Sequence, residues 1–190
     1  AQGFSRRWDW QTLKKYGGGT LNNTGPHFLD QALVLFGKRL PKVFCVRDRV
    51  LTLGDAEDHV KVILYGKGSP TVEVEITSAS AYRQDAWLVM GSQGGLIGTP
   101  DELKWKYFNP AALPKRELSE QPTPDRSYNS EKLDWIEETW SSKNDTSLDE
   151  NGFYLDVYEA VRNRKPLTVK PEEVRRQLWV IGQCNKLAPV

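Results

Sequence analysis

The sequence predicts an α+β fold: an open, largely antiparallel β-sheet with helices packed on one face. Two observations lead to this prediction. Apolar residues follow a helical period near both ends of the 190-residue chain and a period of two in its middle. Strands grouped together with short connections favour antiparallel pairing over alternating βαβ units. The other face of the sheet is then available to water or to oligomerisation.

Two helices are expected before the sheet, over residues 9–16 and 26–36. Asp9 is a suitable cap for the first, and three consecutive glycines after Tyr16 end it. The second begins near Pro26, because proline is preorganised for the first helical position, and stops at Gly37. Its apolar residues crowd one broad face, which predicts packing against the core.

Seven short segments with a period of two are expected to form strands. They cover residues 43–46, 50–53, 60–65, 72–77, 87–90, 95–97 and 103–108. Glycine-rich turns after the third and the fifth of these segments predict two hairpins. Residues 109–130 contain four prolines, which indicates a surface excursion. Two amphipathic helices, over 152–164 and 171–187, then close the chain.

The amino-acid composition is that of an ordinary globular protein. There are 26 basic and 25 acidic residues, so the formal charge of +1 gives no reason to expect nucleic acid or an anionic membrane as partner. No apolar run approaches the roughly 20 residues that cross a bilayer. Cys45 and Cys184 are expected to be free thiols in a reducing compartment, although one long-range bridge remains open. We therefore expect a cytoplasmic protein.

The segment from Gly17 to Asp30 contains the strongest candidate for chemistry. It places His27, one of two histidines, in the first turn of a helix beside flexible backbone. The positive end of the helix dipole favours a neutral imidazole, which can act as a general base for a hydroxyl group. Asp30 follows one turn later and can orient the ring. A histidine at this position can also simply bond a loop carbonyl, so both interpretations stay open.

Two runs are specific enough to compare with a known family. They are Arg7-x-x-Trp10-Gln11 and Gly17-Gly18-Gly19-x-Leu21-x-Asn23-x-Gly25-x-His27-x-x-Asp30. Both resemble the start of the C-terminal domain in the glucose–fructose oxidoreductase and inositol dehydrogenase family. The similarity extends over nearly the whole chain, with residues 109–151 matching least.

The resemblance implies a two-domain enzyme whose N-terminal Rossmann domain binds NAD or NADP. Residues 1–190 would be the single C-terminal substrate and oligomerisation domain, with the Rossmann domain absent from this chain. In the family, a lysine of that Rossmann domain faces the histidine that matches His27, and the two handle the hydroxyl proton during hydride transfer. Members such as inositol dehydrogenase have an aspartate where this chain has Asn23. An amide binds a hydroxyl without taking up its proton, so Asn23 is expected to be a substrate or orienting ligand.

Other candidates have competing interpretations. Trp10 and Arg7 lie close to the glycine run and can line a sugar pocket; core packing for Trp10 and a surface ion pair for Arg7 are the simpler explanations. His59 follows the acids at 55–58, which suggests a metal site, but the ligand spacing is unconvincing and a solvated loop is preferred. No metal ligand is therefore assigned. The glycines at 66–68 and 91–95 read as hairpin turns and not as phosphate loops.

Two functional hypotheses follow. In the first, the chain is the substrate-binding half of an NAD(P)-dependent dehydrogenase for a sugar, a sugar derivative or a cyclitol, and is inactive alone. The sequence contains no Gly-x-Gly-x-x-Gly motif, so its cofactor would be held by the absent domain. In the second, the same fold is a non-catalytic carbohydrate-binding or assembly module. Both hypotheses allow a homo-oligomer formed through the sheet face.

Overall fold

The structure is a computed structural model and describes residues 2–144 and 152–190. The chain divides into two compact units, one made of residues 1–84 and 151–190 and the other of residues 85–150. The α+β class and the antiparallel pairing are confirmed. The named strands form two sheets, of three and four strands, where the sequence suggested one.

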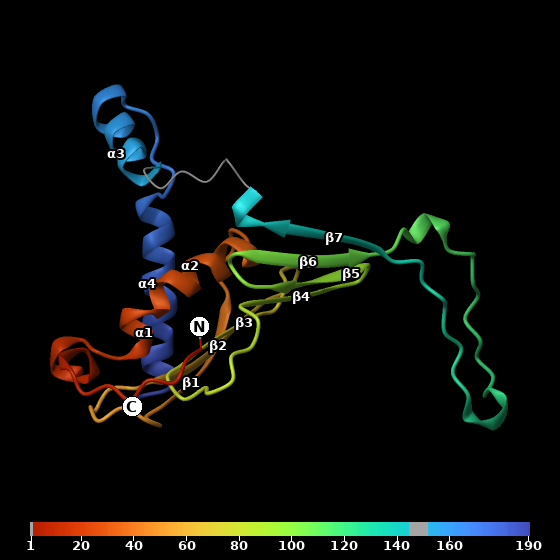
Figure 1. Cartoon of the computed structure of the whole chain (residues 1–190), viewed down its shortest axis with the longest axis horizontal. Helices are drawn as coiled ribbons and strands as arrows, with labels where there is room; N and C mark the ends of the chain where they lie inside the picture. Colours follow the sequence, from red (N-terminus) through yellow and green to blue (C-terminus); the bar gives the residue numbers. More distant parts are fainter. Residues whose placement is uncertain (1, 145–151) are drawn as a thin grey trace. The chain divides into compact units, whose positions relative to one another are not determined.

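The first unit is built on the sheet β1-β2-β3. Its strands are β1 (Lys42–Asp48), β2 (His59–Tyr65) and β3 (Val72–Thr77). Helices α2 (Gly25–Phe36) and α4 (Pro171–Leu187) pack together against one face of this sheet (Figure 1). The alternation along β2 explains this arrangement, because every second side chain is an aliphatic one that points to the helices. The buried core residues are Leu21, Leu29, Ala32, Leu33, Phe36, Cys45, Val60, Val62, Leu64, Val74, Ile76, Val180, Ile181 and Cys184.

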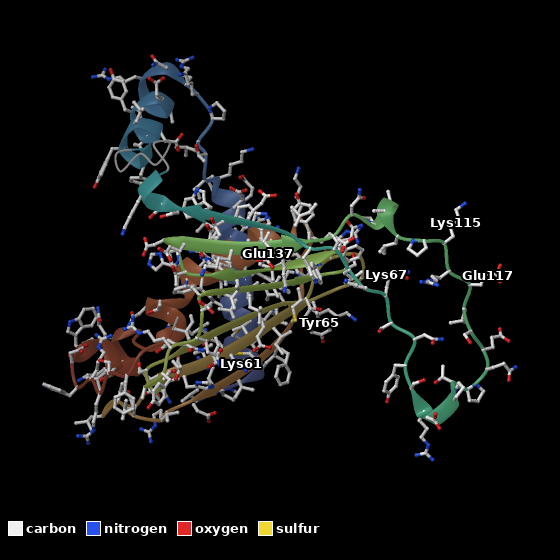
Figure 2. All side chains as sticks on the ribbon, turned by 45° about the vertical axis from the view of Figure 1, so that its right-hand side comes forward. Lys61, Tyr65, Lys67, Lys115, Glu117 and Glu137 are labelled. Atoms are coloured by element: carbon white, nitrogen blue, oxygen red, sulfur yellow. The ribbon has the colours of Figure 1, made fainter. Side chains whose placement is uncertain are left out.

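The opposite face of this sheet carries a mixture of charged and apolar side chains. Lys61 and Tyr65 extend from β2 on this side (Figure 2). The Lys61 ammonium lies 3.0 Å from a carboxylate oxygen of each of Glu73 and Glu75 on β3, a cross-strand pairing that the period of two predicts. Phe44 is 51% exposed. Within this unit, apolar surface therefore remains uncovered on the sheet.

A loop replaces one predicted strand. Residues 50–53 were expected to be extended, but β1 ends at Asp48 and β2 starts at His59. The Asp58 carboxylate accepts hydrogen bonds from the backbone N–H groups of Val50, Leu51 and Thr52, at 2.6, 2.8 and 2.6 Å. Those donors are turned inward to the carboxylate and are not available to a neighbouring strand, so the prediction was wrong.

The segment before α2 consists of shorter helical elements than the sequence suggested. Two single 3-10 turns, Trp10–Thr12 and Lys14–Tyr16, replace the helix expected over 9–16, because Leu13 between them is extended. Asp9 caps the first turn as predicted, accepting from the Gln11 N–H at 3.0 Å. After the three glycines comes a short helix that the sequence did not predict, α1 (Thr20–Asn23). It leads almost directly into α2, where Pro26 lies in the first turn and Gly37 ends the helix as expected.

Two side chains of α4 form hydrogen bonds with the two ends of α2. The Gln177 amide donates to the carbonyl of Pro26 at the start of α2. The Arg176 guanidinium donates to the carbonyls of Leu33 and Gly37 at its end, both at 2.6 Å. The C-terminus of a helix carries the negative end of its dipole, so this cation stabilises the end of α2.

The second unit is a four-stranded antiparallel sheet in the order β4-β5-β6-β7. Its strands are β4 (Trp87–Gly91), β5 (Gly94–Gly98), β6 (Glu102–Tyr107) and β7 (Ile136–Ser141). The predicted β4–β5 hairpin is confirmed, and β7 is an additional strand. Residues 108–135 form a long excursion between β6 and β7, in which only the short turns Pro110–Ala112 and Pro124–Arg126 are regular (Figure 1). Lys115 and Glu117 project from it (Figure 2).

Helix α3 (Gly152–Asn163) completes the described elements, close to the predicted bounds. Its apolar residues are spaced for one face, yet none of its side chains is buried. No helix in residues 2–144 or 152–190 combines the length and the apolar character that a membrane span requires.

Candidate functional site

The glycine run folds back on itself and brings the segment around Gln11 against the start of α1. The N–H of Gly19 donates to the carbonyl of Gln11 at 3.0 Å, and the N–H of Gly18 to that of Leu13 at 3.1 Å. Gly19 has a φ of 109°, a conformation that residues with a side chain rarely adopt. A Cβ there would also lie 2.6 Å from an oxygen of Glu57. Only glycine fits this position.

A polar cavity of about 220 Å³ lies beside this folded run, within the first unit. Two of the five predicted site residues, Arg7 and Asn23, line it. The Asn23 amide donates to the carbonyl of Gln11 at 3.4 Å, which orients it along the wall. The remaining polar groups of the wall are mostly uncharged hydroxyls and amides: Gln2, Gln11, Thr12, Thr20, Thr24, Thr52, Thr77 and Ser78.

The charged groups at the cavity are compensated by partners. Arg7 forms a bidentate pair with Asp9, at 2.9 and 2.8 Å, and also donates to Gln11. This guanidinium lowers the pKa of Asp9. The Arg7 ion pair is thus confirmed, and the same side chain also lines the cavity.

Two buried carboxylates form part of the wall. Glu57 accepts from the Leu21 N–H at 3.1 Å and lies 3.6 Å from the guanidinium of Arg47. For Asp58, burial is the largest single effect and opposes ionisation. The backbone donors of Thr52, Val50 and Leu51 together outweigh it, so the pKa of Asp58 is lowered. Neither carboxylate is left as a free charge.

The other three predicted site residues lie outside the cavity wall. His27 is exposed in the first turn of α2, four residues after Asn23, and its backbone N–H donates to the Thr24 carbonyl at 3.2 Å. Asp30 is half-buried one turn later. Trp10 is 59% exposed and meets Tyr16 edge-on, with ring centroids 6.4 Å apart, so the expectation of core packing was wrong. The structure therefore brings Asn23 and Arg7 together and places His27 at the helix start nearby.

The prediction for the acidic residues at 55–58, just before β2, was wrong. The sequence suggested a solvated loop, but Glu57 and Asp58 are 4% and 2% exposed, and His59 is half-buried. Glu57 holds the start of α1, and Asp58 organises the loop over 50–52. Three acids followed by a histidine are compatible with a solvated loop, a metal site or a buried network. The sequence offered one indication of burial, which is that the acids directly precede the buried strand β2. No group of three or more His, Cys, Asp or Glu side chains in the described ranges is placed to hold a metal ion.

The glycine turns of the two hairpins do not fit the phosphates of a dinucleotide cofactor. Such a site needs a glycine-rich turn between a strand and the N-terminus of a helix. Here Gly66 and Gly68 lie in the turn between β2 and β3, and Gly91 and Gly94 lie in the β4–β5 hairpin, as predicted. A shallow hollow of about 570 Å³ beside that hairpin is lined by three glycines and by Val89, Ser92, Gln93, Leu96, Trp105, Lys106 and Tyr107.

The sequence model of the GFO/IDH/MocA C-terminal domain matches residues 1–97. This span includes the glycine run, the cavity wall, α2 and the sheet of the first unit. The chain belongs to the GFO/IDH/MocA family. The resemblance proposed from the motifs is confirmed. No curated protein sequence matches the chain significantly.

Solved structures of oxidoreductases share the fold of this GFO/IDH/MocA chain. An NAD-binding protein from Listeria innocua has 21% identity and a TM-score of 0.74, and the match covers 99% of this chain and 55% of that one. An oxidoreductase from Bacillus cereus has 17% identity and a TM-score of 0.72, with 98% and 54% covered. The chain therefore spans about half the length of these proteins.

Proposed function

We propose that this chain provides the substrate-binding half of an NAD(P)-dependent oxidoreductase that acts on a hydroxyl or carbonyl group of a sugar, sugar derivative or cyclitol. The observation that carries the proposal is the sequence Asn23 to His27. Asn23 lines a polar cavity, and four residues later His27 is exposed at the start of α2. Family membership supports the oxidoreductase class.

The cavity wall suits a neutral ligand rich in hydroxyl groups. Its amides and hydroxyls both donate and accept hydrogen bonds, which matches the hydroxyls of a polyol. Arg7 is engaged by Asp9, and Glu57 by Arg47, so neither presents an unpaired charge that would favour an ionic ligand. Asn23 would bind a substrate hydroxyl, with Arg7 and Gln11 forming the adjacent wall.

In this proposal His27 exchanges the proton of the reacting hydroxyl. An exposed imidazole can act as general base or acid for a hydroxyl of a substrate held at the cavity mouth. Asp30, one turn later on α2, is the group on the same helix that can orient it. Asn23 has no carboxylate to take up the proton, so it contributes binding and orientation.

Hydride exchange at the substrate carbon belongs to a nicotinamide cofactor, NAD or NADP. We assign the cofactor to an N-terminal Rossmann domain, because the glycine turns of the two hairpins join strands and do not open a helix, and the chain spans about half of its structural relatives. A cytoplasmic location suits the two free cysteines of the core.

We further propose that the uncovered face of the sheet β1-β2-β3 joins copies of the protein into a homo-oligomer. Phe44 and Tyr65 are exposed there beside the charged group of Lys61, Glu73 and Glu75. Exposed aromatic side chains within a polar surround are typical of protein interfaces.

The reading frame around the codon for Ala1 provides the first test. A Rossmann domain with a Gly-x-Gly-x-x-Gly motif directly upstream is expected. The protein carrying both domains should then reduce NAD or NADP with one member of a panel of sugars, sugar acids and cyclitols, followed by absorbance at the nicotinamide band. Saturable sugar binding by the 190-residue chain, with no nicotinamide-linked activity when both domains are present, would instead establish the non-catalytic module.

A further inference from the structure

Gln11 lies in the wall of the polar cavity, and its backbone is hydrogen-bonded on both sides. Its N–H donates to Asp9 Oδ1 at 3.0 Å. Its carbonyl accepts from the Gly19 N–H at 3.0 Å and from the Asn23 side-chain amide at 3.4 Å. Gln11 therefore connects the turn Trp10–Thr12 with the glycine run and with Asn23, and these bonds fix its position in the wall.

The side-chain amide of Gln11 has a defined orientation as well. The Arg7 guanidinium donates to Gln11 Oε1, and it also donates through two of its nitrogens to the carboxylate of Asp9. A guanidinium carries donors only, so the end of the amide that meets it must be the carbonyl oxygen. The other end is then the NH₂ group, which can only donate. Arg7 lowers the pKa of Asp9, so the carboxylate that holds the guanidinium stays ionised at neutral pH.

Asn23 has the opposite polarity. The Gln11 carbonyl can only accept, so the Asn23 amide turns its NH₂ group toward it and keeps Oδ1 as an acceptor. Asn23 is exposed and Gln11 is half-buried. Within residues 2–144 and 152–190, neither Gln11 Nε2 nor Asn23 Oδ1 has a hydrogen-bond partner. The cavity wall thus presents one oriented donor and one oriented acceptor on side chains that are bonded to each other.

We propose that Gln11 is a specificity-determining residue whose amide nitrogen donates a hydrogen bond to a hydroxyl oxygen of the substrate, beside Asn23, whose amide oxygen accepts one. A hydroxyl group both donates and accepts, so the hydroxyls of a sugar or cyclitol satisfy both side chains, whereas a deoxy position satisfies neither. Arg7 and Asp9 act through Gln11 and are positioning residues. The inference rests on the proposed function, which supplies the polyhydroxylated substrate.

Gln11→Glu separates a role in recognition from a role in structure. Glutamate has the shape of glutamine and keeps an oxygen for Arg7, so the contact that orients the side chain is preserved. Its second oxygen replaces the NH₂ group, so the donor to the substrate is lost. Gln11→Met removes both polar atoms at nearly the same length and adds no charge. A donor role predicts the same loss in both variants.

Initial rates are measured in the protein that carries both domains, with its preferred sugar or cyclitol and the monodeoxy analogues of that compound. We expect Gln11→Glu to raise KM by about 5–20-fold with a smaller effect on kcat, because a substrate oxygen loses its donor. One analogue, which lacks the hydroxyl that Gln11 binds, should have the same KM in the native protein and the variant. Gln121→Glu makes the same change of charge at an exposed position in the excursion, and should leave every KM unchanged.

An unchanged KM in Gln11→Glu and Gln11→Met would overturn the inference and leave the proposed function intact. An equal rise in KM for every analogue would also overturn it, because a structural or general electrostatic effect does not single out one hydroxyl. If no compound of the panel is turned over, the proposed function fails. Isothermal titration of D-glucose and myo-inositol into the 190-residue chain then decides the inference: binding that Gln11→Glu weakens supports it, and absent or unaffected binding overturns it.

Discussion

The carboxylate of Glu57 lies directly against Gly19, and a Cβ on Gly19 would meet it at 2.6 Å. The same carboxylate accepts from the Leu21 N–H and faces Arg47, which in turn holds the end of α4. The conformation of the glycine run, and with it the place of Asn23, is therefore set by a buried ion pair beneath it. This relationship leads to the first of five predictions.

Gly19→Ala should lower the free energy of unfolding by about 1–3 kcal/mol, because its φ of 109° is strained for any side chain and the new methyl meets Glu57. Urea unfolding measures the loss. Gly182→Ala is the matched control, since it lies within α4 with nothing inside 4 Å and should be stabilising by up to about 1 kcal/mol. Equal effects of the two substitutions would contradict the role assigned to Gly19.

Asp58→Asn should destabilise the chain by about 2 kcal/mol at neutral pH, because three backbone donors lose a charged acceptor. The pKa of Asp58 is lower in the folded chain than its ordinary 3.8. Its stabilisation is therefore complete above that value and is lost as the pH falls below it, through the folded-state pKa. Urea titrations between pH 7 and pH 2 should show a shallower acid loss in the variant. Asp48→Asn, at an exposed position, should leave the profile unchanged.

His27→Ala, in the protein that carries both domains, should lower kcat by about 10²–10⁴-fold, because the reacting hydroxyl loses its proton acceptor. Steady-state rates with the preferred sugar measure the effect. His59→Ala removes the other histidine, at the start of β2, and should keep most of the activity. Full turnover in His27→Ala would remove this residue from the mechanism.

Asn23→Ala should raise KM for the sugar by about 3–10-fold, with a smaller effect on kcat, because a substrate hydroxyl loses one hydrogen-bond partner. Initial rates over a range of sugar concentrations separate the two parameters. The neighbouring Asn22 bonds the carbonyl of Gly17 and does not line the cavity, so Asn22→Ala should leave KM unchanged. An unchanged KM in Asn23→Ala would show that the substrate binds elsewhere.

Phe44→Glu should dissociate the proposed homo-oligomer, because it replaces an exposed aromatic side chain of the uncovered sheet face by a charge. Sedimentation velocity gives the oligomeric state directly. Val34→Glu introduces the same charge at a position on α2 that is 73% exposed, and should leave assembly intact. If both variants sediment like the unsubstituted protein, the sheet face is not the interface.

Local signals were enough to predict most elements of the fold. Pro26, Gly37 and the apolar stripe between them define α2 to within a residue, since caps and periodicity act within one helix. The turns rich in glycine likewise located both hairpins. These features depend on residues that are neighbours in sequence.

Features that depend on distant partners escaped prediction. The burial of Glu57 depends on Arg47 and on the Leu21 N–H, 36 residues away, whereas a run of acids is usually solvated. Strand β7 carries Glu137 and Glu138, and its polar pattern becomes a strand only beside β6, across the long excursion. At the site, motif similarity identified Asn23 and Arg7, but the role of Gln11 in orienting the Asn23 amide required the folded glycine run.

The hydrogen bonds from α4 to the two ends of α2 have a consequence for biosynthesis. The Gln177 amide and its acceptor, the Pro26 carbonyl, are 151 residues apart in sequence. The helix that bears His27 therefore emerges from the ribosome long before the side chains of α4 that bind it. During translation α2 would have a solvent-exposed apolar stripe. This stripe can be covered by α4 only after the final helix has been made.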